Sequence, residues 1–169
     1  FNARMHQPGG FPRPLAANER KWKTKTGKAE FKVPASLCAA FDGDGGADVL
    51  RLMTMRSNDQ FNTTVYGYDD RFRGVKGTRM VLFMNAADIA RLGFADAEIV
   101  DVTTVADDRV RSVKGLRIVA YNIPPGNCAG YYPELNPLIP LWHHDEQSKT
   151  PAAKAIPVTI ARSASPLQG

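Results

Sequence analysis

The sequence has very few cysteines, and this scarcity limits the classes of protein to which it can belong. Its 169 residues include only Cys38 and Cys128, which are far apart and form no C-x-x-C pair. The spacing argues against a zinc ribbon, an iron–sulfur site and a disulfide scaffold built from this chain. Reduced thiols in a cytoplasmic protein are the simpler interpretation.

Long apolar runs and long blocks of one charge are also missing. No run approaches the roughly 18 residues of a membrane span, and no signal peptide opens the chain. We therefore expect a cytoplasmic protein without a membrane segment. The net charge is +5, and no block of like charges is long enough to form a basic tail. This charge is compatible with binding to nucleic acid, to a phosphate-bearing ligand or to an acidic partner, and also with no specific partner. Because the chain begins at Phe1 rather than Met, we expect a fragment of a longer protein or a processed chain.

The common catalytic and nucleotide-binding motifs are absent as well. The sequence contains no P-loop, no G-x-G-x-x-G and no G-x-S-x-G. His143 and His144 are adjacent, and neighbouring side chains of an extended segment point to opposite sides, which makes a poor chelate. Cys128 lacks a local nucleophile signature, so a structural cysteine is the favoured interpretation.

What the sequence does contain is a series of short apolar segments separated by glycine and proline turns. Asn85 has the residue type of a helix N-cap and Gly93 that of a C-terminal stop, which predicts one short helix between them. The pattern favours a mostly-β fold, a barrel or a sandwich. We expect about six short strands, at residues 27–33, 49–55, 79–84, 99–105, 115–121 and 156–161, with a further extended segment at 109–113.

Composition divides the chain into two parts. Residues 1–26 are rich in proline and glycine and end in a basic cluster, which predicts an extended N-terminal arm or linker. Residues 27–169 would form the β domain. Within it we expect loops at residues 68–78 and 123–141. The loop at 123–141 is long, and loops of such length are usually functional. A structural cover over the barrel core is an equally open alternative.

A dense set of polar side chains follows the predicted strand at residues 49–55. Amide side chains offer a donor and an acceptor together, and the arginine fork suits phosphate or carboxylate. These residue types are also turn formers, so a loop that satisfies its own backbone remains an open alternative. The set consists of Arg56, Gln60, Asn62 and Thr63.

Four motifs in order resemble one known family. They are Thr-Met-Arg-Ser-Asn-Asp-Gln-Phe-Asn-Thr at 54–63, the segment 85–102 beginning Asn-Ala-Ala-Asp-Ile-Ala-Arg-Leu-Gly, Gly-Tyr-Tyr-Pro-Glu-Leu-Asn-Pro-Leu at 130–138, and Pro-Ala-Ala-Lys at 151–154. Together they resemble the molybdopterin-dinucleotide-binding domains, with formate-dehydrogenase-like alpha subunits as the nearest subgroup.

The resemblance implies a double-psi β-barrel that forms the C-terminal domain of a larger molybdenum-dependent oxidoreductase. Such a domain holds the molybdopterin guanine dinucleotide, while earlier domains carry the metal ligand and the iron–sulfur cysteines. This chain would then have no catalytic residue and no metal ligand of its own. Its partners would be the remaining domains of the parent enzyme, and nucleic acid is not expected.

The resemblance also implies a set of cofactor-binding residues. Contacts to cofactor phosphates or pterin are expected from Arg56, Ser57, Gln60, Asn62 and Thr63. The pterin side would be lined by Tyr132, Glu134 and Asn136, with Lys154 at the rim.

Two departures from the family pattern lie outside this set. Ala86 replaces a proline, and Ala97 replaces a glycine, so the turn at Ala97 is expected to differ in type.

Two further hypotheses come from other classes. One is a stand-alone β-barrel module that binds protein or nucleic acid without a cofactor, favoured by the basic arm. The other is a barrel hydrolase or decarboxylase that uses Cys128 or His143.

Overall fold

The computed structural model describes residues 2–33, 46–61, 67–106 and 108–164. The chain divides into two compact units, Phe1–Asp42 and Gly43–Gly169. The first contains a short helix α1 (Asn2–Met5) and a 3₁₀ turn η1 (Ala16–Glu19), and neither has a buried residue.

The strand predicted at residues 27–33 does not form. These residues lie outside any strand, and Phe31 and Val33 are 98% and 84% exposed. Alternation of apolar and polar residues suits a strand only when a neighbouring strand and a core are present to pair with it. The prediction was wrong because local pattern cannot supply that partner.

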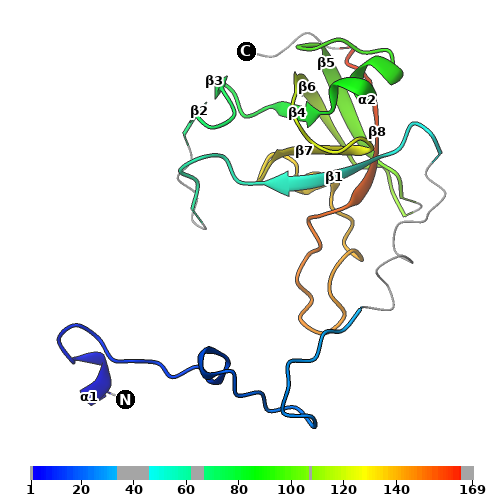
Figure 1. Cartoon of the computed structure of the whole chain (residues 1–169). Coiled ribbons are helices and arrows are strands. Elements are labelled where there is room, and N and C mark those ends of the chain that lie inside the picture. Colours follow the sequence, from blue (N-terminus) through cyan, green and yellow to red (C-terminus); the bar gives the residue numbers. More distant parts are fainter. Residues whose placement is uncertain (1, 34–45, 62–66, 107, 165–169) are drawn as a thin grey trace. The chain divides into compact units, whose positions relative to one another are not determined.

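The second unit contains a closed barrel of six strands, in the order β1-β7-β4-β6-β5-β8 (Figure 1). This confirms the mostly-β prediction, and the closed barrel agrees with the double-psi β-barrel that the resemblance implies. Two of the neighbouring pairs, β1 with β7 and β4 with β6, are parallel. The strands are β1 (Leu50–Met55), β4 (Val81–Met84), β5 (Ile99–Thr104), β6 (Ser112–Ala120), β7 (Asn127–Tyr131) and β8 (Ile156–Arg162).

Strand β7 lies inside the segment 123–141, which was predicted to lack regular structure. Its sequence, Asn-Cys-Ala-Gly-Tyr, has no β-branched residue and therefore no strong strand signal. It forms because β1 pairs with it on one side and β4 on the other. The prediction for this segment was wrong, since the strand depends on partners distant in sequence.

Two other segments also differ from expectation. The region 68–78, predicted as a loop, contains the two-residue strands β2 (Asp69–Asp70) and β3 (Val75–Lys76), which pair antiparallel. One long strand, β6, runs through Gly115. It overlaps both the extended segment predicted at 109–113 and the strand predicted at 115–121. Gly115 has a φ of 73°, opposite the register shift of β5 between Val100 and Val102.

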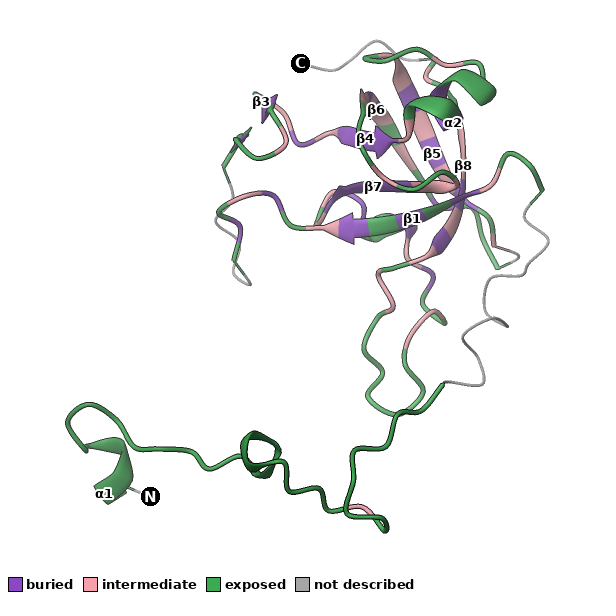
Figure 2. Ribbon diagram, viewed as in Figure 1, coloured by how far each residue is buried: buried purple, intermediate pink, exposed green. Residues whose placement is uncertain are grey.

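Buried residues, purple in Figure 2, lie along the strands of the barrel, and their apolar side chains form its core. In β1 the burial alternates, with Leu50, Leu52 and Thr54 buried, whereas β4 is buried at all four positions. Each large aliphatic side chain that is fully buried contributes about 1.5–3 kcal/mol.

The predicted helix forms as α2 (Ala86–Arg91), and its predicted cap is confirmed. The side chain of Asn85 accepts a hydrogen bond from the Ala87 N–H at 2.8 Å and donates one to the Ile123 carbonyl at 2.6 Å. Gly93, with a φ of 74°, follows the helix. Buried Asp88 accepts a hydrogen bond from the Gly126 N–H at 2.6 Å, which joins the helix to the start of β7.

The parallel pair β1–β7 determines where the polar segments meet. Met55 is in register with Tyr131 at the carboxyl ends of the two strands. Residues 56–60 and 132–136 therefore leave the barrel at the same end, although more than 70 positions separate them in the sequence.

Candidate functional site

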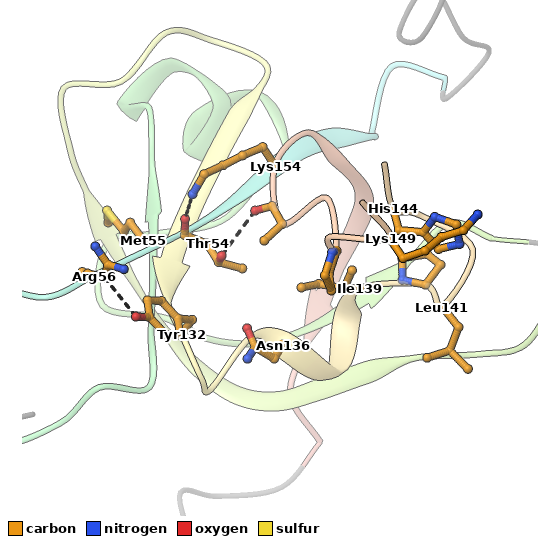
Figure 3. Close-up of a pocket in the computed structure, with 13 residues that line it drawn as sticks. Thr54, Met55, Arg56, Tyr132, Asn136, Ile139, Leu141, His144, Lys149 and Lys154 are labelled. Carbon is orange, nitrogen blue, oxygen red and sulfur yellow. Dashed lines mark hydrogen bonds between the residues drawn. The ribbon is translucent and has the colours of Figure 1, made fainter. Parts of the chain in front are cut away.

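A pocket of about 860 Å³ opens beside the carboxyl end of β1 (Figure 3). Three parts of the chain build it: the end of β1, the segment that follows β7, and the long connection that leads into β8. Its lining residues are Thr54, Met55, Arg56, Tyr132, Asn136, Ile139, Pro140, Leu141, His144, Lys149, Pro151, Ala153 and Lys154.

The charge of this pocket has one sign. Arg56, Lys149 and Lys154 line it, and none of its described lining residues is an aspartate or glutamate. Three cations at the mouth of a partly apolar cavity attract an anionic ligand and exclude a cationic one. The pocket is also lined by apolar side chains such as Met55 and Ile139, which can pack against a flat organic group.

Arg56 and Tyr132 form one wall of the pocket. The Nε of Arg56 donates a hydrogen bond to the Tyr132 hydroxyl oxygen at 3.0 Å (Figure 3), and its guanidinium carbon lies 5.8 Å from the centre of the tyrosine ring. Both contacts restrict the rotamers of the two side chains, so the positive group is held in place before a ligand binds.

The segment 151–154 is fixed to β1 on another side of the pocket. The Ala153 carbonyl accepts hydrogen bonds from the Thr54 N–H at 3.0 Å and from the Thr54 hydroxyl at 3.3 Å. The Lys154 ammonium donates to the Thr54 carbonyl. Figure 3 shows the lysine ammonium directed at the end of β1.

The connection before β8 contributes two residues that sequence reasoning missed. His144 and Lys149 line the pocket because the chain folds back between them, with a β-bridge from His144 to Pro151. Asp145 stabilises this turn by accepting hydrogen bonds from the backbone of Gln147 and Ser148. These bonds lower the pKa of the Asp145 carboxyl. No local motif marked the two residues as ligand-facing.

The structure separates the nine predicted cofactor-binding residues into three groups. Arg56, Tyr132, Asn136 and Lys154 line the pocket together. Asn62 and Thr63 lie outside the described residues. The third group, which does not line the pocket, consists of Ser57, Gln60 and Glu134. The cofactor contacts of the second and third groups stay predictions.

The third group is joined by hydrogen bonds within the protein. Ser57 and Gln60 are buried, and the Gln60 side-chain oxygen accepts a hydrogen bond from the Ser57 N–H at 3.0 Å. The Gln60 amide nitrogen donates to the Tyr132 carbonyl at 2.9 Å. Glu134 forms an ion pair with Arg79 at 2.6 Å. Arg79, which was not among the predicted site residues, donates hydrogen bonds to all three residues of this group.

Cys128 does not belong to the site. It is fully buried on β7, and burial, with a smaller contribution from the charge of Asp88, raises the pKa of its thiol. A thiol held protonated in the core is a poor nucleophile, which argues against the hydrolase hypothesis that uses Cys128.

The described part of the chain contains neither a cluster of metal ligands nor a helix suited to span a membrane. No three His, Cys, Asp or Glu side chains there are grouped so as to hold a metal ion. None of the helices described has the length and apolar character that crossing a membrane requires.

Comparison with known proteins gives a consistent result. The family model described as "Molydopterin dinucleotide binding domain" matches residues 50–157. An uncharacterized oxidoreductase of Mycobacterium tuberculosis (strain H37Rv) is 43% identical over 171 residues, which cover 97% of this chain and 21% of that protein. Protein YdeP of Escherichia coli (strain K12) is 38% identical over 170 residues, covering 96% of this chain and 22% of YdeP. The chain thus spans about a fifth of the length of the curated relatives it matches.

Proposed function

The chain belongs to the molydopterin dinucleotide binding domain family, and on that premise we propose that its pocket binds the molybdopterin guanine dinucleotide of a larger oxidoreductase resembling formate dehydrogenase. When bound, such a cofactor supplies redox chemistry at a metal held mainly by other domains. The chain's own residues bind and orient the organic part. No catalytic residue is assigned to them.

The observation that carries this proposal is that Arg56, Lys149 and Lys154 are cations and that no described lining residue of the pocket is acidic. The pocket lies at the shared end of two parallel strands. Arg56 and Lys154 supply donors of the kind that pyrophosphate oxygens accept. Tyr132 offers a ring face, and Asn136 a donor and an acceptor for a heterocycle. A ligand that is anionic at one part and flat at another fits this set of groups.

The remaining predicted contacts, from Ser57, Gln60, Asn62, Thr63 and Glu134, are retained as part of the proposal. For Ser57, Gln60 and Glu134 the support is indirect. Gln60 donates to the Tyr132 carbonyl, while Ser57 and Glu134 accept hydrogen bonds from Arg79, which donates to the same carbonyl.

The parent enzyme is proposed from the relatives. The mycobacterial relative is named an oxidoreductase, and this chain matches only a fifth of it. We infer that the partners of the domain are the other domains of such a protein. Formate-dehydrogenase-like activity and a cytoplasmic location are part of the same proposal. The activity rests on the four motifs at 54–63, 85–102, 130–138 and 151–154, and the location rests on cysteine usage.

The test uses the full-length protein that contains this chain. Arg56→Gln and Lys154→Gln are expected to lower the guanine nucleotide and molybdenum retained after purification by about tenfold each, since each removes a charge-assisted hydrogen bond to an anion. Retained nucleotide is measured by acid release and chromatography, and molybdenum or tungsten by elemental analysis.

The matched control is Arg162→Gln. Arg162 is an exposed cation on β8 that pairs with Glu98 and does not line the pocket. Retention equal to that of the unaltered protein is expected for it. Equal retention for Arg56→Gln and Lys154→Gln as well would contradict the proposal.

The exposed cations of residues 20–28 favour a second candidate, a module that binds nucleic acid. Binding of that kind weakens steeply with salt, because phosphate contacts release counterions. Titration with a labelled RNA 20-mer at two salt concentrations tests it. Binding that persists after Lys21, Lys23 and Lys25 are changed to Gln would contradict this candidate.

A further inference from the structure

Arg79 is an arginine that the fold buries almost completely. It precedes β4, its side chain is only 3% exposed, and it does not line the pocket. Burial of a guanidinium is costly unless its donors are paired. Its position therefore needs an explanation in terms of what it bonds.

Among the described residues, the guanidinium of Arg79 donates to groups from two segments. From the segment after β1, the Ser57 hydroxyl accepts at 2.6 Å and the Gln60 side-chain oxygen at 3.0 Å. From the segment after β7, the Tyr132 carbonyl accepts at 2.9 Å and the Glu134 carboxylate at 2.6 and 3.2 Å. One rigid fork thus joins both segments.

These two segments carry the pocket wall. Arg56 precedes Ser57 directly, and the Tyr132 carbonyl that accepts from Arg79 belongs to the residue whose ring and hydroxyl contact Arg56. Fixing Ser57 and the Tyr132 backbone therefore fixes the relative position of the Arg56 and Tyr132 side chains. The ring of Tyr131, 4.8 Å from the guanidinium carbon, supports Arg79 from another direction.

We propose that Arg79 is a positioning residue that holds the Arg56–Tyr132 wall of the pocket in its ligand-binding arrangement. The inference rests on the proposed function of the pocket, and it assigns no ligand contact to Arg79. Because Glu134 balances its charge, Arg79 acts through geometry and not through the net charge of the site.

Two variants separate geometry from charge. Arg79→Gln removes the fork and leaves the Glu134 carboxylate unpaired. The double variant Arg79→Gln/Glu134→Gln also removes the fork but keeps the net charge of the site unchanged. Glutamine has two donors and cannot reproduce the five N–H groups of the guanidinium. If Arg79→Gln alone does not fold, the double variant is used to test the role of Arg79, because it leaves no buried unpaired carboxylate.

The first measurement is amide hydrogen exchange of the full-length protein without ligand. In both variants the exchange of residues 56–61 and 132–136 is expected to rise on the order of tenfold, since several bonds to a charged group are lost. Protection of β5 and β6 stays as in the unaltered protein. Arg111→Gln is the matched control, because Arg111 is a buried arginine paired with Asp108 at 2.6 Å outside the pocket.

The second measurement is retention of the guanine dinucleotide. Arg79→Gln/Glu134→Gln is expected to retain about tenfold less, and combining it with Arg56→Gln adds little further loss, because both changes disable the same wall. For Arg111→Gln combined with Arg56→Gln, the retention is expected to equal that of Arg56→Gln.

Unchanged exchange of residues 56–61 and 132–136 in the folded double variant overturns the inference, whatever the ligand result. Retention restored by the double variant but not by Arg79→Gln also overturns it, since charge would then be the cause. A protein that retains no guanine dinucleotide at all refutes the proposed function instead, and the exchange result still decides the role of Arg79.

Discussion

At the scale of single residues, Asp70 is a buried carboxylate held by several donors. The Tyr131 hydroxyl donates to it at 2.7 Å and the Arg73 guanidinium at 2.6 Å. Burial alone would raise the pKa of Asp70, but these hydrogen bonds outweigh burial and lower it below the ordinary value. The same environment, chiefly burial, raises the pKa of Tyr131.

The lowered pKa of Asp70 predicts acid sensitivity. A carboxyl whose pKa is depressed by folding stabilises fully above its unfolded pKa, near 4, and loses that contribution as pH falls through the folded pKa. Asp70→Asn is therefore expected to cost about 1–3 kcal/mol at pH 7, and its free energy of unfolding should fall less between pH 7 and pH 3 than that of the unaltered chain. Urea unfolding at the two pH values measures both quantities.

Asp69→Asn serves as the control for this prediction. Asp69 pairs with Lys76 at 3.4 Å, and both side chains are exposed, so the change should stay within about 0.5 kcal/mol. Identical pH dependence in Asp70→Asn and the unaltered chain would show that the carboxylate is not held as described.

Ala97 adopts the left-handed conformation that glycine would favour. Its φ is 64°, and its N–H donates to the Ile118 carbonyl at 3.0 Å, so the residue occupies a left-handed turn position although it is not glycine. Ala97→Gly removes a strain of about 1–2 kcal/mol, partly offset by the greater freedom of glycine in the unfolded chain. We expect a net gain of about 0.5–1 kcal/mol in thermal or urea unfolding. Ala87→Gly within α2 should lose a similar amount, and a loss in Ala97→Gly would contradict the argument.

At the scale of elements, β7 has a position where only glycine fits. A Cβ on Gly130 would lie 2.2 Å from Leu135 Cδ1 and 2.9 Å from the Val81 carbonyl oxygen. The Leu135 side chain can turn away, but the backbone of β4 cannot move without disturbing the barrel. The close approach of β7 to its neighbours therefore sets the path of the pocket segment that follows it.

Gly130→Ala is expected to destabilise the barrel by about 1–3 kcal/mol through overpacking. Urea unfolding checks the value. Gly67→Ala is the matched control, because the nearest atom to a Cβ there lies at 4.0 Å, and it should change stability by less than about 0.5 kcal/mol. Equal stability of the two variants would refute the steric argument.

At the scale of the whole molecule, the buried side chains gather in the second unit. The helices of the first unit bury no residue, whereas the barrel has a continuous apolar core. We propose, as the composition suggested, that residues 27–169 form a domain and 1–26 an arm. Residues 27–33 are all exposed, so they add little to the stability of the domain.

Two truncated chains test this division. Chains that begin at residue 27 and at residue 43 are expected to unfold cooperatively, with urea midpoints equal to that of the 169-residue chain within error. A midpoint that falls only when residues 27–42 are removed would place those residues in the folded domain. Aggregation of both truncated chains would contradict an independent barrel.

Sequence reasoning was accurate where the signal is local. Strands β1, β4, β5 and β8 carry runs of apolar residues, and α2 carries its own N-cap and stop, so each could be found without knowledge of the rest. The order of the four motifs also identified the family. Such features depend only on residues within one short segment, so they can be recognised from the sequence without the tertiary structure.

What only the tertiary structure decided depends on partners distant in the chain. β7 forms without a strand signal because β1 and β4 flank it, and residues 27–33 have the signal but no strand to pair with. In the site, Arg56 and Tyr132 form one wall because parallel pairing brings their segments to one end of the barrel. Ser57, Gln60 and Glu134, whose ligand contacts stay predictions, accept hydrogen bonds from Arg79. Hydrogen bonding and burial decide such roles, and both are determined by which distant groups the fold places together.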